Sequence, residues 1–255
     1  MKKIGLIGGM SFESTITYYE QINRKINERL GGLSSAEILL SSVNFEEIEV
    51  CQRENRWEDA GEILARHAMI LQGGGADFIF ICTNTMHRCF DAVQSAVSVP
   101  VAHIADATLK ALKNAGVAKV GLLGTVYTMT QDFYKSRLIE GGAEVFLPSA
   151  VDMAEVNRVI FEELCYGKIA PSSKANFLRI IEDFRSRGAQ GAILGCTEIG
   201  MLVSQADTDV RLFDTTQIHI DAAVEAALSP VSSFFRNRSS GKQLKSKTNF
   251  ILPFT

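Results

Sequence analysis

Long apolar runs, paired cysteines and proline are all scarce in this chain of 255 residues. No stretch approaches the roughly 20 apolar residues that a membrane span requires, so we expect no membrane-spanning segment. The five cysteines are odd in number and include no Cys-x-x-Cys pair, which argues against a disulfide framework. The first residues carry no cleavage site typical of a secretory signal. We therefore expect free thiols in a cytoplasmic protein.

The chain also has little excess of charge of one sign, since its net charge is −3. Such a chain lacks the basic field that attracts nucleic acid or an anionic membrane, and we expect neither partner. Residues 231–255 are the exception, with five basic residues and no acid. This segment lacks periodicity, so we expect a basic, disordered tail.

Short β-rich runs alternate with longer amphipathic segments over the rest of the chain, which predicts parallel sheets covered by helices. The sequence predicts strands at residues 3–8, 37–43, 77–82, 99–104, 119–124, 144–147, 190–195 and 210–213. It predicts helices at residues 13–30, 57–72, 105–115, 131–140, 154–166, 172–187 and 216–228. The fold class is therefore α/β.

The chain also contains two similar halves. One half begins Lys3-Ile4-Gly5-Leu6-Ile7-Gly8 and the other Lys119-Val120-Gly121-Leu122-Leu123-Gly124. A small polar residue follows a later apolar run in each half: Thr83, 75 residues after Gly8, and Cys196, 72 residues after Gly124. We expect one α/β lobe at residues 1–115, a second at 116–213, and a helix at about 214–230 that returns to the first.

Ligands of open parallel sheets bind beyond the carboxyl ends of the strands. Four predicted strand ends carry small or polar residues, and we expect them to face one cleft between the lobes: Gly9-Met10-Ser11, Thr83-Asn84-Thr85, Thr125 and Cys196-Thr197-Glu198. A tight strand-to-helix turn explains the first of these, with Ser11 or Ser14 as helix cap. Backbone N–H groups at that helix start also suit a carboxylate.

Cofactor and metal sites are poorly supported. The Gly8-Gly9 turn lacks the G-x-G-x-x-G pattern and a following ribose-binding acid, which argues against a dinucleotide. None of the lysines lies at a strand end in a way that would support a pyridoxal phosphate site. Cys82, His87 and Cys89 are close in sequence, but a strand end and the following helix would splay them, so we expect no metal.

Cys196 is the strongest candidate for a reactive group. A cysteine is often a small buried hydrophobe. Cys196, however, directly precedes Thr197-Glu198, where the sequence predicts the start of a helix. A helix N-terminus lowers the pKa of a thiol, so we expect a raised thiolate fraction here.

Four motifs, in order and spacing, resemble the aspartate/glutamate racemase family: Gly8-Gly9-Met10-Ser11, Cys82-Thr83-Asn84-Thr85-Met86-His87, Leu123-Gly124-Thr125 and Gly195-Cys196-Thr197-Glu198. The resemblance extends from Lys3 to about Leu228. It implies two pseudo-symmetric, Rossmann-like lobes with the active site between them. It also implies racemisation of an amino acid without a cofactor, by two bases on opposite faces, in a homodimer.

The family usually supplies one cysteine from each lobe, but this chain has Thr83 in place of the first. Cys82 is adjacent, yet successive strand residues point to opposite faces, so it does not substitute. The pattern resembles a subgroup that acts on L-aspartate and L-glutamate with a Thr/Cys pair. Cys165 stands where many aspartate racemases have a lysine. The substrate contacts implied by the resemblance are Met10, Gln52, Asn84, Thr85, Thr125, Thr197 and Glu198.

The pair predicts asymmetric chemistry. A thiolate acts as a base near neutral pH, whereas a threonine hydroxyl does not ionise there but can donate a proton. The hypothesis is that Cys196 deprotonates the L-enantiomer and Thr83 protonates the opposite face. Two alternatives stay open: a related decarboxylase or cis–trans isomerase that uses Cys196 alone, and a non-catalytic amino-acid-binding protein.

Overall fold

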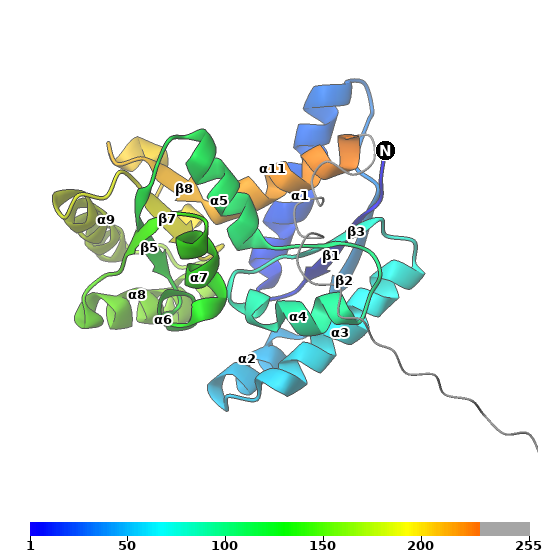
Figure 1. The fold of residues 1–255 in the computed structure, drawn as a ribbon, viewed down its shortest axis with the longest axis horizontal. Helices are drawn as coiled ribbons and strands as arrows, with labels where there is room; N and C mark the ends of the chain where they lie inside the picture. The colour runs from blue at the N-terminus through cyan, green and yellow to red at the C-terminus, as the bar shows by residue number, and fades with distance from the viewer. Residues whose placement is uncertain (230–255) are drawn as a thin grey trace, which may run out of the picture.

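The computed structural model describes residues 1–229, and the predicted tail at 231–255 lies outside the described residues. Its elements form two side-by-side bodies, each built around one sheet (Figure 1). The strands are β1 Ile4–Gly8, β2 Ile38–Ser42, β3 Phe78–Ile81, β4 Val101–Ala102, β5 Lys119–Gly124, β6 Glu144–Phe146, β7 Ala192–Gly195 and β8 Leu212–Asp214.

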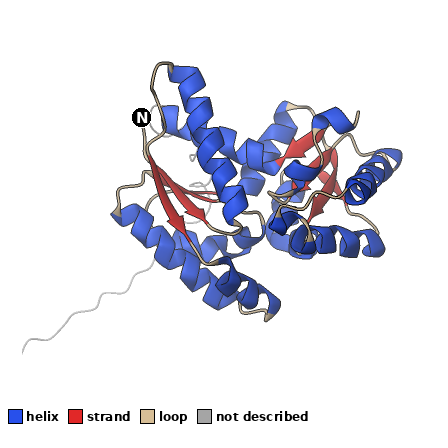
Figure 2. Cartoon of the chain, turned by 180° about the vertical axis from the view of Figure 1, so that it is seen from behind, coloured by secondary structure: helices blue, strands red, loops and turns tan. Residues whose placement is uncertain are grey.

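Eleven α-helices occur within residues 1–229. They are α1 Phe12–Leu30, α2 Phe45–Arg53, α3 Trp57–Gly73, α4 Phe90–Ser95, α5 Ile104–Asn114, α6 Val126–Thr130, α7 Asp132–Glu140, α8 Ala150–Glu162, α9 Pro171–Ser186, α10 Ile199–Leu202 and α11 Thr215–Leu228. Three short 3₁₀ turns join them: η1 Thr85–Cys89, η2 Leu164–Tyr166 and η3 Gln205–Asp207. Helices flank both faces of each sheet (Figure 2).

The two sheets share one topology. Their strand orders are β2-β1-β3-β4 and β6-β5-β7-β8, and every pair is parallel. The predicted α/β class with two parallel sheets is therefore confirmed. The connection changes direction between β1 and β3 in the first sheet and between β5 and β7 in the second. Ligands of such sheets bind outside the carboxyl ends of strands at these switch points.

The central strands are apolar along their whole length because both of their faces are covered. Every residue of β3 is buried, and Ile79 and Ile81 pack towards α3 while Phe78 and Phe80 pack towards α1 and α11. Helix α11 thus joins the core of the first sheet although it follows β8 in the chain (Figure 1). Helix α5 contributes Ile104 and Leu112 to the core of the second sheet.

Several predicted elements differ from those observed. The predicted strand at 99–104 is only Val101–Ala102, because His103 already caps α5. The helix predicted at 154–166 begins at Ala150 and ends at Glu162. Helices α2, α4 and α6 had no predicted counterpart; they are short, with five to nine residues each. Among the described helices, none is long and apolar enough to cross a membrane.

Candidate functional site

A small cavity, here called the cleft cavity, lies between the carboxyl ends of the central strands of the two sheets. Its volume is about 20 Å³, which is room for roughly one water molecule. The first sheet and its helices provide Met10, Phe45, Gln52, Thr83 and Thr85, and the second provides Thr125, Ile160, Phe161, Cys165, Cys196 and Glu198. The cleft cavity therefore contains Thr83 and Cys196, the pair predicted to be catalytic.

Two of the predicted substrate contacts do not line the cleft cavity. The Asn84 amide donates a hydrogen bond to Thr215 Oγ1 over 3.0 Å, which links the strand end after β3 to α11. The Thr197 hydroxyl donates to Glu198 Oε2 over 2.6 Å. Asn84 therefore ties two separate segments together, whereas Thr197 contacts the carboxylate of the adjacent residue.

Cys196 follows the last residue of β7 and is 93% buried, with 7% of its surface exposed. Its thiol donates to Glu198 Oε2 over 2.9 Å, and Ser11 of the other lobe donates to Glu198 Oε1 over 2.8 Å. The Glu198 carboxylate thus accepts from Cys196, Thr197 and Ser11. It connects the thiol to the helix start of the opposite lobe.

The expectation that a helix start lowers the pKa of Cys196 is wrong for this structure. Burial raises the pKa of the thiol well above its ordinary value, and the nearby Glu198 carboxylate raises it further. The following helix, α10, has one turn and begins only at Ile199. So short a helix has little dipole to set against the loss of solvation. The thiol is therefore protonated and donates to Glu198.

Thr83 lines the cleft cavity, while the adjacent Cys82 does not. Cys82 is fully buried among Tyr18, Phe80 and Ala223 on the α1 and α11 face of the first sheet. Burial raises the pKa of its thiol far above the ordinary value. Cys82 is thus a core residue, as the alternation of side chains along a strand predicts.

Hydroxyl and amide contacts close the cleft cavity from both lobes. Thr85 and Thr125 are 3.0 Å apart through their Oγ1 atoms, and Tyr127 donates to the backbone oxygen of Gln52 over 3.4 Å. The Gln52 amide N–H faces the sulfur of Met86 at 3.0 Å. A thioether is a weak acceptor, so this amide can exchange the contact for a better one.

Four residues of the lining were not among the predicted substrate contacts: Phe45, Ile160, Phe161 and Cys165. Burial raises the pKa of the Cys165 thiol to about 12. Phe45 is the first residue of α2, and the signal for this helix was Asn44, which caps it and is followed by two acids. Among the described residues that line the cleft cavity, none is a lysine or an arginine.

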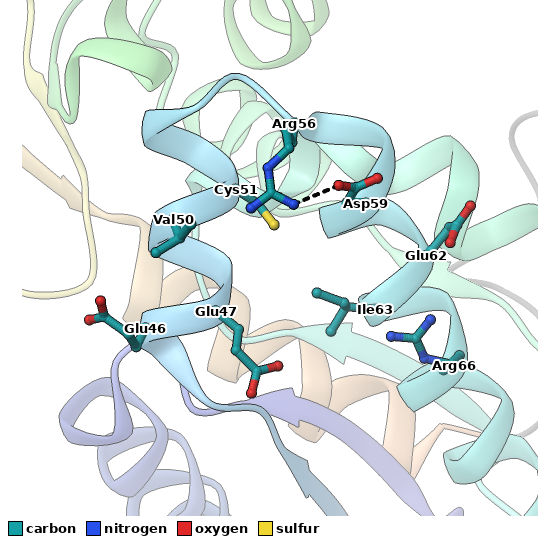
Figure 3. A pocket seen from close by; sticks show the side chains of 9 residues that line it. All are labelled: Glu46, Glu47, Val50, Cys51, Arg56, Asp59, Glu62, Ile63 and Arg66. Carbon is teal, nitrogen blue, oxygen red and sulfur yellow. Dashed lines mark hydrogen bonds and ion pairs between the residues drawn. The ribbon is translucent and has the colours of Figure 1, made fainter.

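A larger surface groove of about 410 Å³ lies between α2 and α3 (Figure 3). Four carboxylates and two arginines line it, and Arg56 pairs with Asp59 at its rim. None of the predicted site residues lines this groove. Within residues 1–229 no cluster of three or more histidine, cysteine or acidic side chains could hold a metal ion.

Known proteins share this arrangement of lobes and strand ends. The family model described as "Asp/Glu/Hydantoin racemase" matches residues 7–223. The chain belongs to this family. Among solved structures, an aspartate racemase homologue from Pyrococcus horikoshii is 41% identical, with a TM-score of 0.79 over 89% of this chain and 99% of that one.

A candidate Asp/Glu racemase from Yersinia pestis is 49% identical to this family member, with a TM-score of 0.85 over 90% of this chain and 100% of that one. A glutamate racemase from Aquifex pyrophilus is 29% identical over 158 residues. That match spans 59% of this chain and 58% of the relative's own length.

Proposed function

We propose that this protein racemises acidic amino acids, L-aspartate or L-glutamate or both, by proton transfer at the α-carbon without a cofactor. The observation that carries the proposal is the cleft cavity, which is lined by one thiol and one hydroxyl from matching strand ends of the two lobes. A planar α-carbanion held between two such groups can be protonated from either side.

Cys196 is the base on the L-enantiomer in this proposal. Its thiol must first lose a proton, and Glu198 Oε2, 2.9 Å away, is the acceptor that supports this step. The resulting thiolate takes the α-hydrogen as a proton, which leaves the carbon with the electron pair. Because burial raises the pKa of Cys196, its thiolate is a stronger base than an ordinary thiolate once it forms, which helps removal of the weakly acidic α-hydrogen.

Thr83 is the acid on the opposite face. Its hydroxyl donates to the α-carbon, since a carbanion is a stronger base than an alkoxide, and it then recovers a proton from water. In the reverse direction a neutral hydroxyl is a poor base, so turnover of the D-enantiomer is slow. The two enantiomers have equal free energies in water, so kcat/KM is the same in both directions, and a low kcat for the D-form implies a low KM.

Recognition of the distal carboxylate falls to neutral donors. The amide of Gln52 and the hydroxyls of Thr85 and Thr125 line the cleft cavity, and the lining includes no lysine or arginine among the described residues. The present volume of about 20 Å³ is too small for aspartate. Binding therefore requires the lobes to separate and close again.

The resemblance to the family supports a homodimer, and the five free cysteines support a reducing cytoplasmic location.

A proton-NMR time course in deuterated water, with L-aspartate, L-glutamate and their D-forms, tests this proposal. The expected result is loss of the α-proton signal from an L-substrate together with formation of its D-enantiomer. New products would instead indicate a decarboxylase or cis–trans isomerase that uses Cys196 alone. Binding without exchange would indicate a non-catalytic amino-acid-binding protein, and either result would contradict the proposal.

A further inference from the structure

His87 is a buried polar side chain beside Thr83 that the proposed chemistry does not use. It lies in η1, four residues after Thr83, and is 1% exposed. Its Nδ1 atom is 2.8 Å from the carbonyl oxygen of Thr83, and its Nε2 atom is 3.2 Å from the backbone nitrogen of Ile104. The ring therefore bridges the strand end after β3 and the start of α5.

These two contacts define which ring nitrogen carries the hydrogen. A carbonyl oxygen can only accept, so Nδ1 carries a hydrogen and donates it to Thr83. The Ile104 N–H can only donate, so Nε2 is the acceptor. The neutral Nδ1–H tautomer satisfies both contacts. A hydrogen on Nε2 could reach the oxygen of Ala102, 3.4 Å away, but it would leave the Ile104 N–H without its acceptor.

The surroundings keep the ring neutral and hold it in one orientation. The rings of His103 and His219 lie 4.7 and 5.7 Å from it between centroids. Burial lowers the pKa of His87 to about 4. At neutral pH the Nδ1–H donor is thus permanently present.

The contact with the Thr83 carbonyl bears directly on the direction of the Thr83 side chain. The Thr83 N–H donates to the oxygen of Ile81 over 2.9 Å, and the Thr83 carbonyl accepts from His87, so the peptide groups on both sides of its Cα are held. Those two peptide planes fix the direction of the Cα–Cβ bond and limit which χ1 rotamers are allowed. We propose that His87 is a positioning residue, which holds the Thr83 hydroxyl towards the face of the α-carbon opposite Cys196. This inference rests on the function proposed above.

A merely structural role for His87 would lower every activity of the enzyme together. A positioning role would lower only the step that needs Thr83. β-Chloro-L-aspartate separates the two. Cys196 takes its α-proton, the electron pair of the C–H bond forms a C=C bond, and the C–Cl bond breaks with release of chloride. The enamine formed then hydrolyses to oxaloacetate and ammonium. Protonation by Thr83 is not required.

The experiment compares inversion of L-aspartate with chloride release from β-chloro-L-aspartate in a set of variants. In His87→Leu, which fills the space without a donor, inversion should fall about 100-fold relative to chloride release, as misplacement of a reacting group by about 1 Å would cause. Thr83→Ala serves as the reference for a lost acid. Tyr134→Phe is the control, because it removes another buried hydrogen bond, that from Tyr134 to Thr108, away from the cleft cavity. It should leave the ratio unchanged.

Rescue by a smaller donor completes the test. In His87→Asn the amide nitrogen can take the place of Nδ1, so the ratio should recover most of its original value. In His87→Gln the amide lies one bond further out, so the ratio should stay low, and this pair provides the comparison if His87→Leu does not fold. Equal ratios in Asn and Gln, or a parallel fall of both rates in Leu, would overturn the positioning role.

The reference variant distinguishes failure of this inference from failure of the proposed function. If Thr83→Ala lowers inversion but not chloride release, while His87→Leu lowers both or neither, then only the role of His87 is overturned. If Thr83→Ala itself lowers both rates equally, Thr83 is not the acid. The proposed function then loses its second catalytic group, and the role of His87 falls with it.

Discussion

At the scale of single residues, the proposed chemistry rests on the difference between the Thr83 hydroxyl and the Cys196 thiol. The Cys196 thiol is buried and donates to Glu198, so its pKa is raised. A lowered pKa, as expected at a helix start, would give a standing thiolate. A raised pKa instead keeps the thiol protonated until it passes its proton to Glu198. Glu198 is thus part of the proposed base.

Replacing the hydroxyl with a second thiol should restore symmetry. In Thr83→Cys, the D-enantiomer meets a group that can ionise, so kcat for D-aspartate should rise at least about tenfold. Because the equilibrium constant is 1, any gain in kcat/KM for D-aspartate must appear equally in kcat/KM for L-aspartate. Initial-rate polarimetry in both directions measures this. An unchanged kcat for the D-form would contradict the placement of Thr83 at the α-carbon.

Glu198 offers a second residue-scale prediction. Glu198→Gln keeps the shape of the side chain but removes the carboxylate that accepts the Cys196 proton, so kcat for L-aspartate should fall about 100-fold with little change in KM. Steady-state kinetics at several pH values checks this result. A raised KM with unchanged kcat would return Glu198 to the role of substrate contact.

At the scale of elements, the strand ends were the predictable part of the site. All eight predicted strands occur, and the repeated apolar runs placed Met10, Thr83, Thr125 and Cys196 at carboxyl ends that do meet in the cleft cavity. Period and turn chemistry determine where a buried strand stops, so single residues after it can be assigned from sequence.

The helices around the cleft cavity were less predictable. Helix α2 is short and buries only Ile48, Cys51 and Gln52, so its periodic signal is weak. Phe161 comes from α8, whose sequence gives no sign that this side chain faces the opposite lobe. The hydrogen bond from Ser11 to Glu198 depends on the approach of the two lobes. Sequence patterns describe local periodicity and do not give the distance between residues of different lobes.

Helix α2 also carries a prediction about substrate recognition. Gln52→Glu keeps the size of the side chain but places a negative charge beside the position proposed for the distal carboxylate of the substrate. Repulsion between like charges should raise KM for L-aspartate about tenfold, equivalent to about 1.4 kcal/mol, with a smaller change in kcat. Glu47→Gln, on the groove side of α2, is the matched control. An unchanged KM would show that the distal carboxylate lies elsewhere.

At the scale of the whole molecule, the proposed function requires the two lobes to separate to admit substrate and then to close on it. Contacts between them surround the cleft cavity: Ser11 with Glu198, Thr85 with Thr125, and Tyr127 with Gln52. These are single hydrogen bonds of modest strength, about 1 kcal/mol each. They can therefore break and form again during each turnover, while the larger apolar cores of the lobes stay intact.

Buried histidines make global stability depend on pH. Burial lowers the pKa of His87 to about 4, with His103, His219 and Arg137 nearby, and it also lowers the pKa of His219 well below the ordinary value. A lowered folded-state pKa means that the unfolded chain binds more protons below about pH 6.5. Stability is thus complete above pH 6.5 and is lost as pH falls towards 4, with about 2 kcal/mol lost at pH 5 from His87 alone. Urea unfolding at pH 7 and pH 5 measures this loss, which should shrink in His87→Asn. Equal stability at both pH values would contradict it.

The most direct test of the central claim follows deuterium during the first turnovers of L-aspartate in deuterated water. If Cys196 removes the α-proton from one face and Thr83 protonates the other, the D-aspartate formed carries deuterium at its α-carbon while the remaining L-aspartate keeps its proton. Cys196→Ser should abolish both the labelling and the inversion. Deuterium in the remaining L-aspartate at the rate of inversion would place removal and return of the proton on one face, and would contradict the Thr83 and Cys196 pair.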